Sequence, residues 1–591
     1  MSFFEMLLSS AWFEVIAAVL LTILIFVTSH RPAWWFWTAT SHEASAPAEG
    51  KFKTVSKVPG PFSLPIFGTR WIFSCIGYYK LNKIHDAYKD LNQRYGALCK
   101  EEALWNFPMI SVFSRQDIET IIRRNSRYPL RPPQEVISHY RRTRRDRYTN
   151  LGLVNEQGQT WHDLRVALTS ELTAASTVLG FFPALNIVAD SFIELIRRQR
   201  VGYKVTGFEE LAYKMGLEST CTLILGRHLG FLKPDSSSEL ATRLAEAVRI
   251  HFTASRDAFY GLPLWKLLPT CAYKQLIESE DAIYKYVWTG IERVENSFAT
   301  LATLSCVQRT IRRRANFQYH FGDHRDHYTG ETRRRERRVG GGHFSIHSQT
   351  KEPRYTGQES GHCRFHSGRY THGTRNNYSN STISLLSSLI DLSLVTNYFT
   401  SLFLHFSQLG NTLVFLFDLI GRNPTVQNKL YEETYALAPA GCDLTIDNLR
   451  KAKYLRACIT ESLRLIPTTT CIARILDEPI ELSGYRLTAG TVVLLHTWIA
   501  GLNEENFKDA KKYLPERWTT PTTPHSPLLV APFGAGRRIC PGKRFVDLAL
   551  QLILAKIIRE FEIIVEEELD LQFEFILAPK GPVSLGFRDR S

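Results

Sequence analysis

Residues 532–542 constrain this chain more than any other stretch, because they place one cysteine between a glycine-rich turn and the start of a helix. Gly534 and Gly536 permit the positive backbone φ that a tight turn needs. Beyond Cys540, apolar residues recur at helical spacing over 545–554. Backbone N–H groups at a helix start favour a thiolate over a thiol, and a thiolate binds metal ions. The stretch therefore predicts a metal ligand at Cys540, although a buried structural cysteine at a turn would look similar.

The spacing of Phe533, Gly536, Cys540 and Gly542 resembles the cysteine loop of the cytochromes P450. Members of that family hold haem b (heme b) through a cysteine thiolate, which pushes electron density toward cleavage of the O–O bond. The resemblance implies that Cys540 is the axial iron ligand and that the other three residues contact the cofactor. It also implies a mainly α fold with a small β region, built as a single large haem-binding domain.

Three arginines and a tryptophan are candidates for contacts with the haem propionates. Arg538 offers a forked cation to a carboxylate. Trp161 and Arg165 are four residues apart and share one face of a predicted helix, so an indole N–H and a guanidinium can converge on one acceptor. Taken alone, this pair is equally compatible with surface packing. The resemblance to the P450 family adds Arg474, which lies where the family places a further propionate contact.

Glu461 and Arg464 are three residues apart on a predicted helix, where a surface ion pair would be the ordinary outcome. Arg517 follows in the motif Pro-Glu-Arg-Trp. The order and spacing resemble the Glu-x-x-Arg helix of the P450 family. The resemblance implies a buried network in which these three residues have the structural role of supporting the cysteine loop.

The composition excludes several other classes of protein. The ten cysteines form no Cys-x-x-Cys pair, which argues against a zinc site and a disulfide framework. The formal net charge of +14 lies mostly in residues 301–377, so the rest of the chain gives no support for nucleic-acid binding.

Residues 1–31 predict a membrane anchor or targeting segment, because 11–27 are almost wholly apolar and a cluster of aromatic residues follows. The lack of Lys and Arg before residue 31 favours an endoplasmic-reticulum signal anchor over a mitochondrial presequence. A cleaved secretory signal is the alternative. Residues 32–68, rich in aromatic residues and proline, predict a hinge.

Residues 303–408 separate an N-terminal part of the domain, 69–302, from a C-terminal part, 409–591. The first part of this segment, 303–377, is rich in arginine and histidine and has no sustained period, and loops of this length are uncommon in compact domains. It occupies the place of the central P450 helix, whose Ala-Gly-x-x-Thr step relays protons to oxygen. That motif is absent, so no catalytic residue is assigned. We hypothesise that a frameshift and a retained intron produced the segment, with an authentic insertion as the alternative.

Hydrophobic periodicity predicts the remaining elements. Helices are expected over 79–95, 117–124, 181–200, 207–225, 240–252, 409–423 and 446–464, and strands over 109–113 and 480–493. The arginine-rich run at 141–147 predicts a solvated loop.

The resemblance is closest to the mitochondrial-type P450s of arthropods, and it implies a monooxygenase that inserts one oxygen atom of O2 into a C–H bond of a steroid. A P450 that acts on another sterol or a fatty acid, and a haem protein impaired in catalysis, are the alternatives. We expect the protein to be bound to a membrane of the mitochondrion or the endoplasmic reticulum. Basic residues indicate a surface for an electron donor, either a ferredoxin or an NADPH-P450 reductase, or simply solvated charge; they are Lys451, Lys453, Arg456, Lys543 and Arg544.

Overall fold

The computed structural model describes most of the chain outside one central segment. Residues 1–300 and 389–591 form one compact unit, and the second unit, 301–388, contains no described residue. The predicted interruption at 303–408 therefore lies outside the described residues except for its last three. The described residues are 15–16, 18–20, 52–65, 67–74, 76–103, 107–124, 126–148, 150–172, 174–225, 228, 230–233, 238–262, 264–266, 268–297, 406–439, 442–520 and 528–590.

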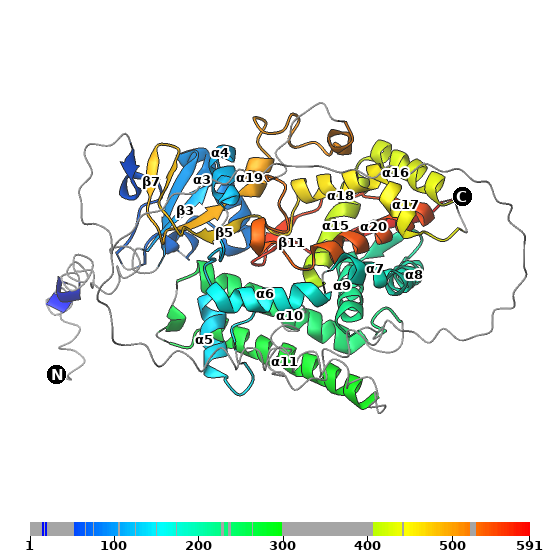
Figure 1. Ribbon diagram of the computed structural model, residues 1–591, viewed down its shortest axis with the longest axis horizontal. Helices are drawn as coiled ribbons and strands as arrows, with labels where there is room; N and C mark the ends of the chain where they lie inside the picture. The colour runs from blue at the N-terminus through cyan, green and yellow to red at the C-terminus, as the bar shows by residue number, and fades with distance from the viewer. Residues whose placement is uncertain are drawn as a thin grey trace, which may run out of the picture. The chain divides into compact units, whose positions relative to one another are not determined.

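Helices are the main element of the described unit (Figure 1). They are α3 (Ile84–Tyr95), α4 (Arg115–Arg123), α5 (Glu135–Thr143), α6 (Gly158–Leu172), α7 (Ala175–Gly180), α8 (Phe182–Gln199), α9 (Phe208–Leu225), α10 (Ser238–Tyr260), α11 (Cys271–Ser297), α15 (Phe406–Gly421), α16 (Pro424–Leu437), α17 (Ile446–Lys451), α18 (Lys453–Leu465), α19 (Thr497–Gly501) and α20 (Lys543–Glu560). Short 3-10 helices are η2 (Val55–Lys57), η3 (Arg70–Phe73), η4 (Leu81–Lys83), η6 (Leu264–Lys266), η7 (Pro515–Trp518) and η8 (Gly536–Arg538). The long amphipathic helices expected over 181–200 and 207–225 are α8 and α9.

Four small sheets supply the β region. The strands are β1 (Lys53–Thr54), β2 (Leu98–Glu102), β3 (Pro108–Val112), β4 (Lys204–Thr206), β5 (Ile472–Ile475), β6 (Ile480–Leu482), β7 (Tyr485–Leu487), β8 (Val492–Leu495), β9 (Phe561–Ile564), β10 (Leu571–Phe573), β11 (Leu577–Pro579) and β12 (Ser584–Asp589). The sheet orders are β2-β3-β8-β5, β1-β7-β6, β4-β12-β9 and β10-β11. In the largest sheet, β3 and β8 are parallel, and β2 and β5 pair antiparallel with their neighbours. A mainly α fold with a small β region is the fold found.

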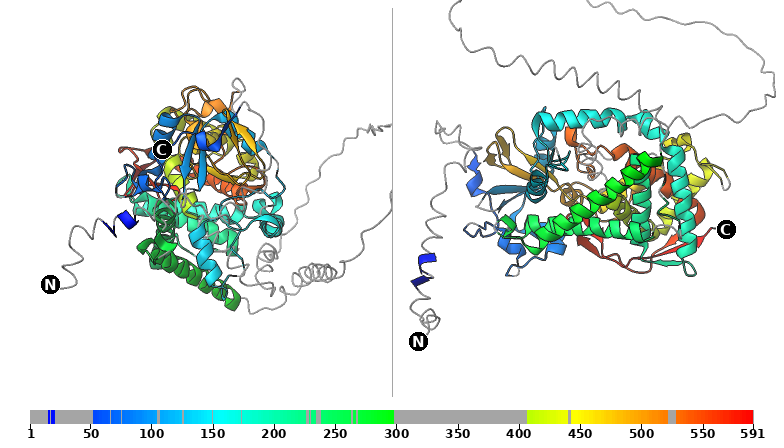
Figure 2. Two further views of the ribbon diagram at one scale, coloured as in Figure 1. Left: turned by 90° about the vertical axis from the view of Figure 1, so that its left-hand side faces the viewer. Right: turned by 90° about the horizontal axis from the view of Figure 1, so that it is seen from below.

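The centre of the helical part is α15, which packs against α9 and α18. Residues 413–417 are fully buried, and a helix that is apolar on all sides is a buried one. The helix predicted over 409–423 is thus confirmed, and it ends just before Pro424, which begins α16. α10 and α11 pack side by side and cover one face of the described unit (Figure 2). α9, α15, α18 and β5 contribute residues to the site described below.

Two local expectations were wrong. The helix expected to begin after Thr445 and run to Arg464 is two helices, α17 and α18, because the chain leaves the helical conformation at Ala452. The arginine run at 141–147 was expected to be solvated, but Arg141 lies in α5 with 3% exposure and forms an ion pair of 2.9 Å with buried Glu280 of α11. The run of charged residues alone could not predict this ion pair, because the glutamate lies more than a hundred residues further along the chain.

Among the residues that the structure describes, no helix is both long and apolar enough to cross a bilayer. The predicted anchor, 1–31, lies outside the described residues apart from a few positions between 15 and 20. Membrane attachment therefore stays a prediction.

Candidate functional site

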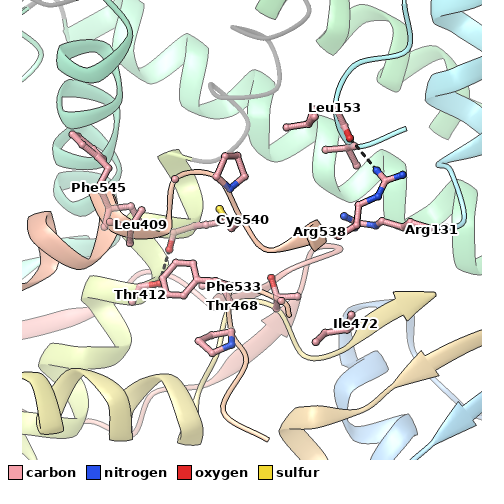
Figure 3. A pocket seen from close by; sticks show the side chains of 18 of the residues that line it. Arg131, Leu153, Leu409, Thr412, Thr468, Ile472, Phe533, Arg538, Cys540 and Phe545 are labelled. Carbon is pink, nitrogen blue, oxygen red and sulfur yellow. Dashed lines mark hydrogen bonds between the residues drawn. The ribbon is translucent and has the colours of Figure 1, made fainter. Parts of the chain in front are cut away.

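A cavity lies where the cysteine loop, α6, α15 and β5 meet (Figure 3). Its volume is about 240 Å³. By the same measure a single water needs only about 10–15 Å³, so the cavity is suited to a larger ligand. Seven of the eight predicted cofactor-binding residues line it: Trp161, Arg165, Arg474, Phe533, Arg538, Cys540 and Gly542.

Gly536, the eighth, is not one of the described residues that line this cavity. It has a φ of +67°, and a Cβ added there would meet nothing within 4 Å. The positive φ shows that Gly536 contributes the left-handed turn, and its contact with the cofactor stays a prediction. Gly534, with a φ of +75°, shares that turn and does line the cavity.

The turn holds Cys540 in place by main-chain hydrogen bonds. The Cys540 N–H donates to the carbonyl of Phe533 at 2.8 Å, and α20 begins at Lys543. Burial raises the pKa of the Cys540 thiol, while the N–H groups of Gly542 and Lys543 and the charge of Arg165 lower it. The N–H groups at the helix start thus lower the thiol pKa as expected, but burial outweighs them and the net shift of the pKa is upward. A metal ion deprotonates a coordinating thiol outright.

Four guanidinium groups converge on one side of the cavity: those of Arg131, Arg165, Arg474 and Arg538. Burial and the neighbouring charge of Arg131 lower the pKa of Arg538 to about 9 and that of Arg474 to about 10. No Asp or Glu is among the described residues that line the cavity. The site therefore has an excess of positive charge on this side, which an anionic ligand would balance.

Arg538 ties the cysteine loop to the segment before α6. It donates to the carbonyls of Pro129 and Glu156, both at 2.9 Å, and its guanidinium stacks 4.0 Å above the Trp161 ring. The Gln157 side chain accepts from Arg538 at 3.1 Å and exchanges hydrogen bonds of 3.1 and 2.7 Å with the backbone of Arg131. Arg131 and Arg538 lie side by side in Figure 3. The cationic side is therefore held by short contacts between three chain segments.

Sequence reasoning missed Arg131 and Gln157. Arg131 lies in the run Tyr-Pro-Leu-Arg-Pro-Pro, and a cation flanked by prolines, which restrict the backbone, is a signal that could have singled it out. It missed the polar groups of α15 as well. Thr412 lines the cavity and donates to the Gln408 carbonyl at 2.7 Å, one turn earlier on the helix (Figure 3).

Glu461, Arg464 and Arg517 meet in a buried network beside the site. The two oxygens of Glu461 accept from Arg464 at 2.7 and 2.9 Å, and one accepts from Arg517 at 2.9 Å. The indole N–H of Trp518 donates to the other oxygen at 2.8 Å. Glu461 and Arg464 are 0% and 2% exposed, so this is no surface pair. The network joins α18 to η7 and the turn before it.

The chemistry of the lining residues fits haem. Its two propionates would balance the arginine side, and its flat apolar ring would meet the side chains of Phe533, Leu409 and Phe545. Cys540 offers a sulfur in the same cavity. Among the described residues, no group of three or more His, Cys, Asp and Glu could hold a metal ion elsewhere.

Comparison with known proteins gives the same result. The family model "Cytochrome P450" matches residues 59–324 and 407–587. The chain is 36% identical to "Ecdysone 20-monooxygenase" of Drosophila melanogaster, over 94% of this chain and 92% of that protein. It is 26% identical to "Cytochrome P450 302a1, mitochondrial" of the same organism, over 91% of this chain and 96% of that protein.

A mouse relative covers the same share of this chain as the ecdysone 20-monooxygenase does, at lower identity. The chain is 26% identical to "1,25-dihydroxyvitamin D(3) 24-hydroxylase, mitochondrial" of Mus musculus, over 94% of this chain and 95% of that protein. The P450 family uses haem with a cysteine thiolate as iron ligand, together with O2, a lipophilic substrate and a redox partner. The match to the family model and the relative at 36% identity, together with the cavity, show that the chain belongs to the cytochrome P450 family and is a monooxygenase.

Proposed function

We propose that Cys540 is the axial ligand of the haem iron and that Arg131, Arg165, Arg474 and Arg538 bind the propionates. One observation carries this assignment: four arginines line the cavity that contains the Cys540 sulfur. No carboxylate is among the described residues that line it. Haem supplies the activation of O2 when bound. The chain supplies the balancing charge, an apolar wall and the position of the ligand.

The proposed reaction is hydroxylation of a steroid, with ecdysone as substrate and 20-hydroxyecdysone as product. The relative at 36% identity over nearly the full length of both chains is named for that substrate and position, which supports the proposal. Apolar side chains such as Leu223, Leu409 and Ile472 line the cavity and suit a steroid ring system. A different sterol or a fatty acid remains the alternative substrate.

We propose a ferredoxin as electron donor and the mitochondrion as location, since two of the compared relatives are named as mitochondrial. Basic residues of α18 and of the start of α20 would face the donor. Of these, Lys543 forms an ion pair with Asp547, and Arg456 donates to the carbonyls of Leu449 and Arg450. Lys451 and Lys453, both exposed, are thus the better candidates for donor contacts.

One experiment tests the reaction and the donor together. The purified full chain is incubated with ecdysone and either a mitochondrial ferredoxin system or NADPH-P450 reductase, and products are identified by mass spectrometry. We expect 20-hydroxyecdysone with the ferredoxin system. Absence of product from a chain that binds ecdysone and gives the reduced carbon monoxide spectrum of a haem thiolate would contradict the proposed substrate.

The ligand assignment has a separate test. Cys540→Ala should lose the thiolate spectrum, whereas Cys442→Ala, at an exposed cysteine, should retain it. A thiolate spectrum unchanged in Cys540→Ala would refute the assignment.

Impaired catalysis is the second candidate function, favoured by the missing Ala-Gly-x-x-Thr step. The family model matches on either side of 325–406 and not within it, which supports an interruption of the family pattern in this region. Sequencing the spliced message across residues 295–412 tests the cause. A message that encodes 303–408 as given would rule out the frameshift and retained intron.

A further inference from the structure

A second cavity, of about 280 Å³, lies beside the one that contains Cys540. It is enclosed by the C-terminal end of α4, the segment 126–130, β5 with the two residues after it, and the cysteine loop. Arg474 is the only described residue that lines both cavities, so the second is a separate site. A single water needs about 10–15 Å³ by the same measure, so a small organic molecule fits there.

Hydrogen bonds fix the walls of the second cavity. The guanidinium of Arg474 donates to the carbonyl of Ala473 at 2.8 Å and to that of Ala535, in the cysteine loop, at 2.9 Å. The Ile475 N–H donates to the Leu130 carbonyl at 3.1 Å. Three chain segments are thus held together around the space, which is the property of a pre-formed ligand site.

The lining of this cavity is cationic. Asp477 is the only carboxylate among the described residues that line it, against four arginines: Arg123, Arg124, Arg474 and Arg537. Arg123 is already paired with Glu119 at 2.8 Å. With that pair set aside and Asp477 offsetting one further arginine, two positive charges are left in excess around one small space. Such an excess favours an anionic ligand.

Two of these cations are open to a ligand that arrives from solvent. Arg124 and Arg537 are exposed, and the guanidinium of Arg537 forms no ion pair with a carboxylate among the described residues. Arg537 belongs to the cysteine loop, whose Arg538 faces the first cavity instead. The adjacent arginines of the loop therefore serve two different sites.

A phosphate monoester matches the excess charge better than a carboxylate does. A phosphate of this kind carries about −1.5 to −2 charges at pH 7, and a carboxylate carries one. Guanidinium groups bind phosphate through pairs of parallel hydrogen bonds, and the hydroxyl of Ser126 adds a donor to the lining. Ile122 and Ile475, both half-buried, supply an apolar wall for a carbon-containing part of the ligand.

We propose that this second cavity binds an organic phosphate monoester. Arg124, Arg474 and Arg537 hold the phosphate, and Ile122 and Ile475 contact its carbon part. The phosphate belongs either to a soluble ester or to the head group of an acidic lipid. The inference does not depend on which substrate the first cavity takes.

The test is isothermal titration calorimetry of the full haem-loaded protein with phenyl phosphate, benzoate and inorganic phosphate. The first two share a ring and differ in charge, whereas inorganic phosphate has the charge without the ring. We expect phenyl phosphate to bind more tightly than the other two, and to bind less tightly below about pH 6, where it loses its second charge. Arg537→Met should weaken its binding by about 10-fold, the lower end for a hydrogen bond to a charged group.

Arg145→Met is the matched control, because Arg145 is an exposed arginine that lines neither cavity. It should leave the affinity for phenyl phosphate unchanged. Arg537→Lys keeps the charge but not the fork, so it should retain part of the affinity.

Phosphatidylcholine vesicles with and without phosphatidic acid distinguish the two sources of the phosphate. Binding that requires phosphatidic acid and is lost in Arg537→Met would assign the site to a lipid head group. Binding of phenyl phosphate with no effect of phosphatidic acid would assign it to a soluble ester.

Three results would overturn the inference: no binding of phenyl phosphate by the wild type, equal affinity for phenyl phosphate and benzoate, or an equal loss in Arg145→Met and Arg537→Met. It would also fail if Arg537→Met weakened only the binding of ferredoxin. The cavity would then take an acidic side chain of the electron donor and not a phosphate ester.

Discussion

Replacement of Arg464 by methionine should prevent stable folding, although Arg464 is no candidate for contact with ligand. Its side chain donates to both oxygens of Glu461 and to the carbonyls of Gly501 and Ala510, the last two at 2.8 and 2.7 Å. Breaking a buried ion pair from one side costs about 3–5 kcal/mol, and each buried carbonyl left without a donor adds about 1–3 kcal/mol. The sum, roughly 5–11 kcal/mol, is comparable with the whole stability of a typical domain, about 5–15 kcal/mol.

The matched control is Arg450→Met. Arg450 forms the same kind of i,i+3 pair with Asp447, at 3.0 Å, on the neighbouring helix α17, but its side chain is 63% exposed. Its loss should cost about 0.5 kcal/mol or less. Soluble yield, haem content and thermal unfolding followed by circular dichroism measure both variants. If Arg464→Met unfolded within a few degrees of Arg450→Met, the argument that burial makes this network indispensable would be refuted.

Three further predictions follow from burial and packing. Burial lowers the pKa of His251 to about 4. Between about pH 4 and 6.5 the unfolded chain therefore binds a proton that the folded chain does not, and the free energy of unfolding should fall as the pH is lowered. In His251→Gln the slope of that free energy against pH should be smaller by about 1.4 kcal/mol per pH unit in this range, as measured by urea titration at several pH values. Gly410→Ala should cost about 1–3 kcal/mol and lower the thermal midpoint, because the new Cβ would lie 2.6 Å from a side chain of α9 and 3.1 Å from its backbone; an unchanged midpoint would contradict this packing. Arg538→Met should lower the haem content of the purified protein, measured as the ratio of haem to chain, whereas Arg537→Met at the exposed neighbouring residue should not; equal haem content in both would contradict the role of charge.

The local parts of the fold were predictable, because their causes are local. The glycines of the cysteine loop have the positive φ that the turn required, and α8, α9 and α20 follow the spacing of their apolar residues. The residues quoted for the site also come together, since seven of the eight line one cavity. For the loop and the Glu-x-x-Arg helix, motif spacing carried enough information to place residues that are far apart in the chain.

The predictions that failed or were not made concern residues whose partners cannot be inferred from the spacing of residues in the sequence. The Arg141 side chain was expected to be exposed to solvent, yet it forms a buried ion pair with Glu280 of α11. Arg131 was overlooked because its role depends on three other arginines that meet it only in the folded chain. At Cys540 the N–H groups that lower the thiol pKa could be inferred from the sequence, whereas the burial that outweighs them depends on the whole fold.

The sheet that contains β12 has a consequence for the folding of the chain during its synthesis. β12 is the middle strand and pairs Ser584 with Thr206 of β4, across almost 380 residues of chain. While the ribosome is still adding those residues, β4 and the helices beside it have an unpaired edge and an apolar face open to water. Newly made chains should therefore depend on chaperones for most of their synthesis, and any message that stops before β12 should yield a product destined for degradation.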